Sequence, residues 1–234
     1  MKSREVILEN LRRSLHRQPR DGAEGAVEAR LLSPQRNIVP QRGQLEGEEL
    51  LELFIRQATT VDATLARVSS DDEVPEAVAD YLKQSNLPPR IRIAPHPDLQ
   101  ALPWSAKAPL LQVAEGRADP EDLVSVTPAF AGVAETGTLV LHSGAETPTT
   151  LNFLPETHVV ILRASQVVGA YEEVWDLLRA TYPQGLPRSV NMITGPSRTA
   201  DIEQRLELGA HGPRRLHIVL IEDERSEHGQ QSPQ

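Results

Sequence analysis

Cysteine is absent from this chain of 234 residues, and its absence excludes several classes of site. Without a thiol the chain forms no disulfide, offers no thiolate nucleophile, and holds no zinc ion or iron–sulfur cluster through cysteine ligands. Long apolar runs are lacking too, since stretches such as residues 218–221 are far shorter than the roughly 20 residues of a bilayer span. The charged start at residues 1–5 leads into no apolar signal segment. We therefore expect a cytoplasmic protein with no membrane span.

Common catalytic and cofactor motifs are also missing. The chain has no Gly-x-Ser-x-Gly elbow and no Gly-x-Gly-x-x-Gly turn. Gly132 and Gly137-Thr138 have the spacing of a phosphate-binding loop, but the lysine is missing and a strand, instead of a helix, follows the loop. No two histidines have metal-ligand spacing and no carboxylate triad stands out, so the sequence predicts no metal site.

Charge is unevenly distributed along the chain. Residues 1–45 carry nine basic and five acidic residues, a net of +4, whereas residues 46–234 carry fifteen and twenty-eight, a net of −13. A basic arm suggests nucleic acid, but its basic residues are scattered and it contains no aromatic residue for base stacking. We expect no nucleic-acid partner, and instead an arm that packs on its own acidic body or on that of a partner.

Hydrophobic periodicity divides the chain into three parts. Residues 1–45 form an N-terminal extension, with a helix at 3–17 followed by an aperiodic stretch that contains several Gly and Pro residues. Residues 46–222 form a regular domain, and the polar tail at 223–234 is predicted to be disordered.

Strands and helices alternate within the regular domain. Strands are predicted at 63–68, 90–94, 123–127, 137–142, 158–163, 189–193 and 216–221; helices are predicted around 50–58, 75–82, 165–180 and 199–208, with a turn or short helix up to 134 and an irregular run at 98–120. The strands are apolar runs without polar alternation, which predicts an α/β fold with a largely parallel sheet and helices on both faces. Ligands in such folds bind beyond the carboxyl ends of the strands, so we expect the binding residues in the loops that follow the strands.

The first loop of interest contains Glu135 among small residues at 131–138. A lone carboxylate in such a loop lies open to close approach by a ligand, which suggests a ligand-contacting or catalytic role. Alternatively, Glu135 accepts hydrogen bonds from backbone N–H groups while the glycines serve a turn.

The second segment, residues 194–203, leaves a strand, turns at Gly-Pro and enters a predicted helix. Ser197 or Thr199 suits the cap of that helix. Alternatively, the helix end and Arg198 hold a phosphate or a carboxylate. Acidic residues such as Asp201 already place negative charge there, so a ribose or another hydroxyl-rich group fits better than a bare anion.

The third segment, residues 209–217, places His211 in a tight loop and His217 inside an apolar strand. A lone histidine in a strand is more often a hydrogen-bonded packing residue than a ligand. Together the three segments predict one pocket, with Glu135 as its catalytic candidate and the ligand-binding residues Thr136, Thr138, Thr194, Ser197, Arg198, Thr199, Asp201 and His211.

Five short motifs occur in order along the second half of the chain. They are Ala134-Glu135-Thr136-Gly137-Thr138, Leu154-Pro155-x-x-His158-Val159-Val160, Ser165-Gln166-Val167-Val168, Thr194-Gly195-Pro196-Ser197-x-Thr199-Ala200-Asp201-Ile202-Glu203 and Gly209-x-His211-Gly212-Pro213. In this order and spacing the chain resembles the lactate utilization protein C (LutC/YkgG) family, which carries the LUD domain. The resemblance covers about 123–221 closely, and the pattern from residue 46 onward agrees with it.

The resemblance implies a fold similar to the CoA-transferase and ribose-5-phosphate isomerase-like superfamily. It also implies a role in oxidising L-lactate to pyruvate, alongside iron–sulfur-bearing proteins of the same pathway. A chain without cysteine fits the part of a cofactor-less subunit or assembly partner. Two alternatives stay open: a ligand-processing enzyme that uses Glu135 on a nucleotide, CoA or sugar phosphate, and a small-molecule sensor without turnover.

Overall fold

The computed structural model describes residues 3–15, 23–32, 34–202, 205–208 and 212–222. The chain divides into two compact units, Met1–Ile38 and Val39–Gln234. The first unit holds α1 (Ser3–Ser14), which has no buried residue, and α2 (Ala23–Leu32). Helix α2 corrects the prediction of an aperiodic stretch after residue 19, because its Ala, Glu, Arg and Leu residues favour helix strongly enough to outweigh one glycine.

A six-stranded sheet forms the centre of the second unit, and every neighbouring pair of strands in it is parallel. Its order is β1 (Thr64–Val68), β12 (Arg215–Ile221), β7 (Thr157–Arg163), β4 (Val124–Pro128), β2 (Arg90–Ile93) and β3 (Gln112–Glu115). The predicted parallel sheet is confirmed. The central strands β12 and β7 are almost wholly buried, which explains their uninterrupted apolar runs.

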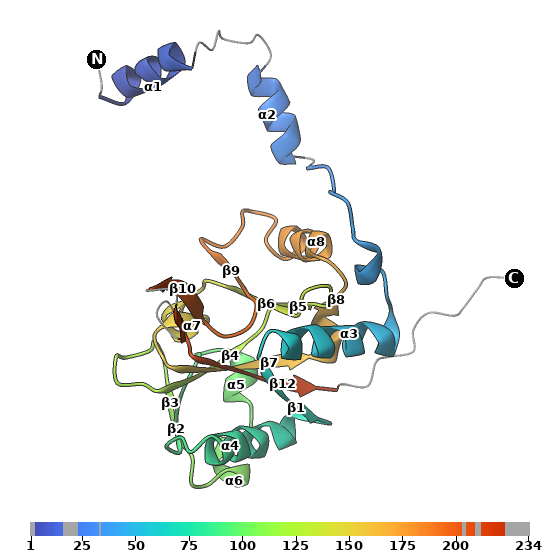
Figure 1. The fold of residues 1–234 in the computed structure, drawn as a ribbon, viewed down its shortest axis with the longest axis vertical. Helices are drawn as coiled ribbons and strands as arrows, with labels where there is room; N and C mark the ends of the chain where they lie inside the picture. The colour runs from blue at the N-terminus through green and yellow to red at the C-terminus, as the bar shows by residue number, and fades with distance from the viewer. Residues whose placement is uncertain (1–2, 16–22, 33, 203–204, 209–211, 223–234) are drawn as a thin grey trace, which may run out of the picture. The chain divides into compact units, whose positions relative to one another are not determined.

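Successive residues of these strands point to opposite faces, and each face has its own core. Val159 and Val219 pack with α4 (Val74–Gln84), α5 (Pro97–Gln100), α6 (Trp104–Lys107) and α7 (Thr150–Phe153). Val160 and Ile218 pack with the apolar face of α3 (Gly47–Thr60). Figure 1 shows α3 on one side of the sheet and α4 with α6 on the other.

A second, four-stranded sheet covers part of the α3 side. Its order is β8 (Val167–Val168), β5 (Ala131–Val133), β6 (Thr138–His142) and β9 (Val190–Ile193); β6 runs antiparallel to both neighbours. Helix α8 (Tyr171–Thr181) packs on this sheet through Val174 and Leu178. The sequence pattern does not indicate the second sheet, because β5 and β8 have only three and two residues. The predicted helix at 165–180 therefore begins at Tyr171, after a 3-10 turn (Ala164–Gln166) and β8.

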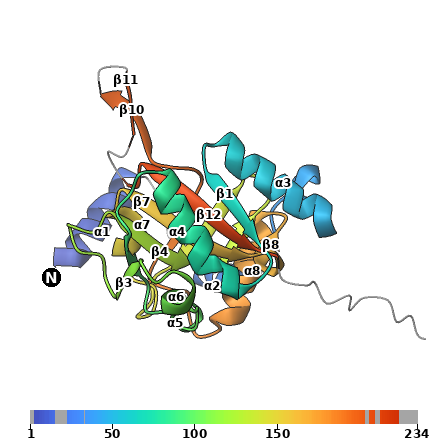
Figure 2. The same ribbon diagram turned by 90° about the horizontal axis from the view of Figure 1, so that it is seen from below.

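Two further predictions are corrected. The run at 98–120 contains the short elements α5, α6 and β3, and is thus less irregular than predicted. The helix predicted at 199–208 is wrong, since β10 (Arg198–Ile202) and β11 (Arg205–Leu208) form an antiparallel hairpin there. So short a segment satisfies either periodicity, and pairing across the hairpin decided the outcome. Figure 2 shows this hairpin projecting from the two larger sheets.

No helix within the described ranges is long and apolar enough to cross a membrane. The tail predicted to be disordered at 223–234 lies outside the described residues.

Candidate functional site

The end of α3 supports the loop that carries the first predicted site residues. Gly137, in the turn between β5 and β6, has a φ of +67°, and a Cβ there would lie 2.2 Å from the Ala58 backbone nitrogen. Gly195, after β9, has a φ of +74°, and a Cβ there would lie 2.3 Å from the Val61 carbonyl oxygen. Glycine is required at both positions because only its backbone adopts this conformation in so little space. The two loops are thereby held side by side.

Four hydroxyl groups meet where these loops approach each other. Thr138 Oγ1 lies 2.7 Å from Thr136 Oγ1, 2.8 Å from the Tyr171 hydroxyl and 2.6 Å from Thr194 Oγ1. Thr136 Oγ1 also lies 3.1 Å from the Tyr171 hydroxyl. We call Thr136, Thr138, Tyr171 and Thr194 the hydroxyl cluster.

Hydrogen-bonding capacity differs across the hydroxyl cluster. A hydroxyl donates one hydrogen bond and accepts two, so the fully buried Thr138 is saturated by its three neighbours. Thr194 is exposed and engages one partner in the cluster, so it retains capacity for a ligand. Thr138 therefore holds the cluster together, while Thr194 presents it to solvent.

Glu135 lies beside the hydroxyl cluster but is turned to the backbone. Its side chain is buried, and its Oε1 accepts a hydrogen bond from the Tyr171 backbone N–H at 3.4 Å. Its own N–H donates to the Gly169 carbonyl oxygen at 3.1 Å. A carboxylate at the first turn of α8 is stabilised by the positive end of that helix. These contacts are those of a structural acceptor.

The remaining predicted residues do not join the hydroxyl cluster in the described part of the chain. Arg198 forms an ion pair with Asp62 and lines a separate pocket at the amino ends of β1 and β12. The backbone N–H of Ser197 donates to the Pro213 carbonyl oxygen at 2.8 Å. Thr199 and Asp201 lie on β10, and His211 lies outside the described residues.

Two residues of these regions were not among the predicted site residues. Tyr171 is the first residue of α8, and nothing in its sequence context marks its hydroxyl as a cluster member. Asp62 follows α3 and has a φ of +64°. The residues next to it in the sequence do not indicate this left-handed conformation. Both become recognisable only when distant segments are brought together.

Two buried histidines are neutral packing residues. His217 Nδ1 shares a 2.8 Å hydrogen bond with Thr64 Oγ1, and its ring stacks on Tyr81 at 3.8 Å. Burial lowers the pKa of His217 to about 4. His158 Nε2 shares a 2.7 Å hydrogen bond with Thr127 Oγ1, and burial lowers the pKa of His158 to about 3. The structure thus agrees with the interpretation of His217 as a packing residue.

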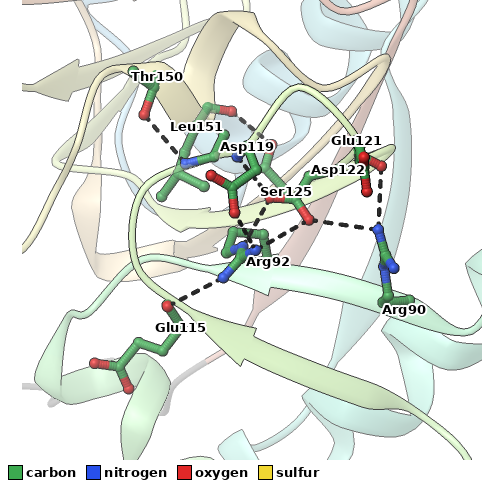
Figure 3. A network of polar contacts seen from close by, with 10 residues as sticks. Arg90, Arg92, Glu115, Asp119, Glu121, Asp122, Ser125, Thr150 and Leu151 are labelled. Carbon is green, nitrogen blue, oxygen red and sulfur yellow. Dashed lines mark hydrogen bonds and ion pairs between the residues drawn. The ribbon is translucent and has the colours of Figure 1, made fainter.

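A charged network lies elsewhere, between β2 and the segment that precedes β4 (Figure 3). Arg92 Nε donates to the buried Asp122 Oδ2 at 2.8 Å, and an Arg92 terminal nitrogen donates to Asp119 at 2.9 Å. The Asp119 backbone N–H donates to Asp122 Oδ2 at 2.8 Å. The charged groups of this network hydrogen-bond to one another, and the network thereby connects β2 to the segment that precedes β4. Among the described residues no group of three or more His, Asp or Glu side chains is arranged to hold a metal ion.

Comparison with known proteins places the chain in a family. The LUD domain matches residues 123–221. Lactate utilization protein C of Exiguobacterium sp. (strain ATCC BAA-1283 / AT1b) is 31% identical over 211 residues, which are 84% of this chain and 90% of that protein. The chain belongs to the lactate utilization protein C family. The resemblance seen in the sequence motifs is therefore confirmed.

Other similarities are narrower. Lactate utilization protein C of Bacillus subtilis (strain 168) is 35% identical over 102 residues, so the match spans 43% of this chain and less than half, 42%, of that protein. A crystal structure of a DUF162 family protein from Deinococcus radiodurans matches with a TM-score of 0.58 and 24% identity, over 76% of this chain and 99% of that chain. That likeness shows a common fold. Similarity to the CoA-transferase superfamily stays a prediction.

The LUD match contains the whole hydroxyl cluster of this lactate utilization protein C family member. Arg198, Arg214 and Arg215 also lie within it, whereas Asp62 and Tyr81 come from the segments that precede it. The pocket lined by these arginines is therefore completed by residues outside the matched domain.

Proposed function

We propose that this chain acts in lactate utilization as a subunit that works with iron–sulfur proteins. The observation that carries the proposal is the match to the Exiguobacterium lactate utilization protein C over most of both chains. Oxidation of lactate to pyruvate releases two electrons and two protons, which an electron carrier must accept. A chain without cysteine has no thiolate with which to hold an iron–sulfur cluster, so in this proposal the cluster belongs to partner chains.

Deletion of the gene in its own host tests the pathway role. We expect the deletion strain to lose growth on L-lactate, to keep growth on pyruvate, and to recover when the wild-type gene is restored. Growth on pyruvate is the control because pyruvate is the product of the oxidation step, so its use does not require that step. Unchanged lactate growth in a strain without a second lactate dehydrogenase contradicts the proposal.

Native mass spectrometry tests the partner role separately. The protein is isolated at low salt from host cells grown on L-lactate, and the same isolation from pyruvate-grown cells serves as the comparison. We expect co-purification with a cysteine-rich, cluster-bearing chain. A lone chain from both cultures contradicts the subunit proposal and leaves the pathway role to the growth test.

The hydroxyl cluster supports a second candidate function, in which the chain processes or senses a nucleotide- or CoA-like ligand. Thr194 faces solvent there, and Glu135 lies on the same loop as Thr136. Glu135→Gln keeps an oxygen that accepts from the Tyr171 N–H but removes the negative charge. Loss of lactate growth with unchanged partner binding favours catalysis by Glu135, whereas normal growth removes Glu135 from the chemistry.

A further inference from the structure

A separate open pocket of about 520 Å³ lies at the amino ends of β1 and β12. Four segments distant in sequence meet in it, namely the connection between α3 and β1, the end of α4, the turn that leads into β10, and the start of β12. Its described lining includes Asp62, Thr64, Tyr81, Arg198, Arg214 and Arg215. The volume lies within the range of small-molecule sites. Ligands were expected at the carboxyl ends of the strands, whereas this pocket lies at the opposite, amino-terminal edge of the sheet.

The charge of the pocket is opposite to that of the chain. The whole chain carries a formal charge of −9, yet the charged side chains among the described lining residues are three arginines and one aspartate, a net of +2. Asp62 pairs with Arg198. Arg214 and Arg215 form no ion pair with any acidic side chain in the described part of the chain. Within the described ranges, these two guanidinium groups are thus left to meet a negatively charged ligand.

Backbone hydrogen bonds and a ring stack hold the walls of the pocket. The backbone N–H groups of Arg214 and Arg215 both donate to the Glu156 carbonyl oxygen, at 2.8 and 3.1 Å. Tyr81 stacks on the buried His217 with an angle of 8° between the rings, and Thr64 shares a hydrogen bond with the same histidine. Burial raises the pKa of Tyr81, so its phenol stays a hydrogen-bond donor at neutral pH.

We propose that this pocket binds a small organic dianion, a phosphate monoester or a dicarboxylate, through Arg214 and Arg215. A guanidinium presents paired N–H groups that match two oxygens of a carboxylate or phosphate. A dianion balances the net charge of the lining. Lactate, a monoanion, leaves half of that charge unmatched, and the faces of Tyr81, Pro196 and Leu216 provide apolar surface for a larger ligand.

Titration calorimetry on the purified full-length chain tests the proposal with three probes. Phenyl phosphate represents a phosphate monoester, succinate a dicarboxylate, and L-lactate the monoanion. We expect saturable binding of at least one dianion, at least tenfold tighter than lactate, that weakens as salt rises. The dianion that binds more tightly shows whether the pocket prefers a phosphate monoester or a dicarboxylate. No saturable binding of either dianion overturns the proposal.

Substitutions locate the site. Arg214→Ala combined with Arg215→Ala is expected to weaken dianion binding by at least tenfold, because each removes charged hydrogen bonds. Arg188→Ala, an exposed arginine outside the pocket lining, is the matched control and is expected to leave affinity unchanged. Equal unfolding midpoints show that all variants remain folded. Unchanged binding in the double variant, or an equal loss in the control, overturns the assignment.

Asp62→Asn changes the affinity in the opposite direction. Its φ of +64° lies in the left-handed region that asparagine tolerates, so the backbone is preserved. Removing this negative charge frees Arg198, and we expect dianion affinity to rise several-fold. Unchanged or weaker binding contradicts the electrostatic reasoning. Because the assay uses the purified chain and no lactate oxidation, its result is independent of the proposed pathway role.

Discussion

Gly137→Ala tests whether α3 sets the position of the loops that carry the hydroxyl cluster. An alanine in the left-handed conformation costs about 1–2 kcal/mol. The new Cβ would also lie 2.2 Å from the Ala58 nitrogen, 2.5 Å from the Gln57 carbonyl carbon and 2.6 Å from Ala58 Cα. All three atoms belong to helix backbone, so the helix must retreat by roughly 1 Å within a close-packed core, which costs about 2–3 kcal/mol more.

The expected loss of unfolding free energy for Gly137→Ala is therefore about 3–5 kcal/mol. Gly185→Ala is the matched control, because Gly185 has a φ of +139° but nothing within 4 Å of its Cβ position. It is expected to cost only the conformational strain, about 1–3 kcal/mol. Urea unfolding followed by circular dichroism measures both, and the difference corresponds to about 1 M in midpoint at a slope of about 2 kcal/mol per molar. Equal losses for the two variants refute the steric argument.

Three further predictions concern stability and buried groups. Because burial lowers the pKa of His158 to about 3, the folded protein does not bind a proton that the unfolded chain binds below about pH 6.5. We therefore expect the free energy of unfolding to fall as the pH drops from about 6.5 toward 3, and NMR to show a neutral His158 ring at about pH 5.5. Asp122→Ala leaves Arg92 without its buried partner, so urea unfolding is expected to show a loss of about 3 kcal/mol. Tyr171→Phe removes one hydroxyl from the cluster and should cost about 1 kcal/mol in the same assay, whereas a neutral result means that water replaces that hydroxyl.

Local sequence predicted the parts of the fold that depend on local burial. Strands β7 and β12 are apolar on both faces, so their composition alone indicates the centre of a covered parallel sheet. Thr136, Thr138 and Thr194 were predicted to line one pocket, and in the structure their hydroxyl groups lie together. Family membership followed from motifs that are themselves short and local.

Tertiary structure decided what depends on pairing between distant segments. The segment at 199–208 suits a helix in isolation, yet its two halves pair as β10 and β11 because a short apolar pattern fits both periods. The two short strands β5 and β8 exist only because each has a neighbour to pair with. The local sequence does not show which distant strand will pair with such a short segment.

The two polar sites show the same division. Thr138 is saturated only because Tyr171, 33 positions later, brings its hydroxyl within 2.8 Å. The arginine-lined pocket joins Asp62 to Arg214 across most of the domain. The sequence by itself determined which residues are apolar enough to build the sheet and which loops are polar enough to bind. Only packing of the sheet against its helices determined which of those polar groups lie together, because charge and hydroxyl complementarity arise from distances in space and not along the chain.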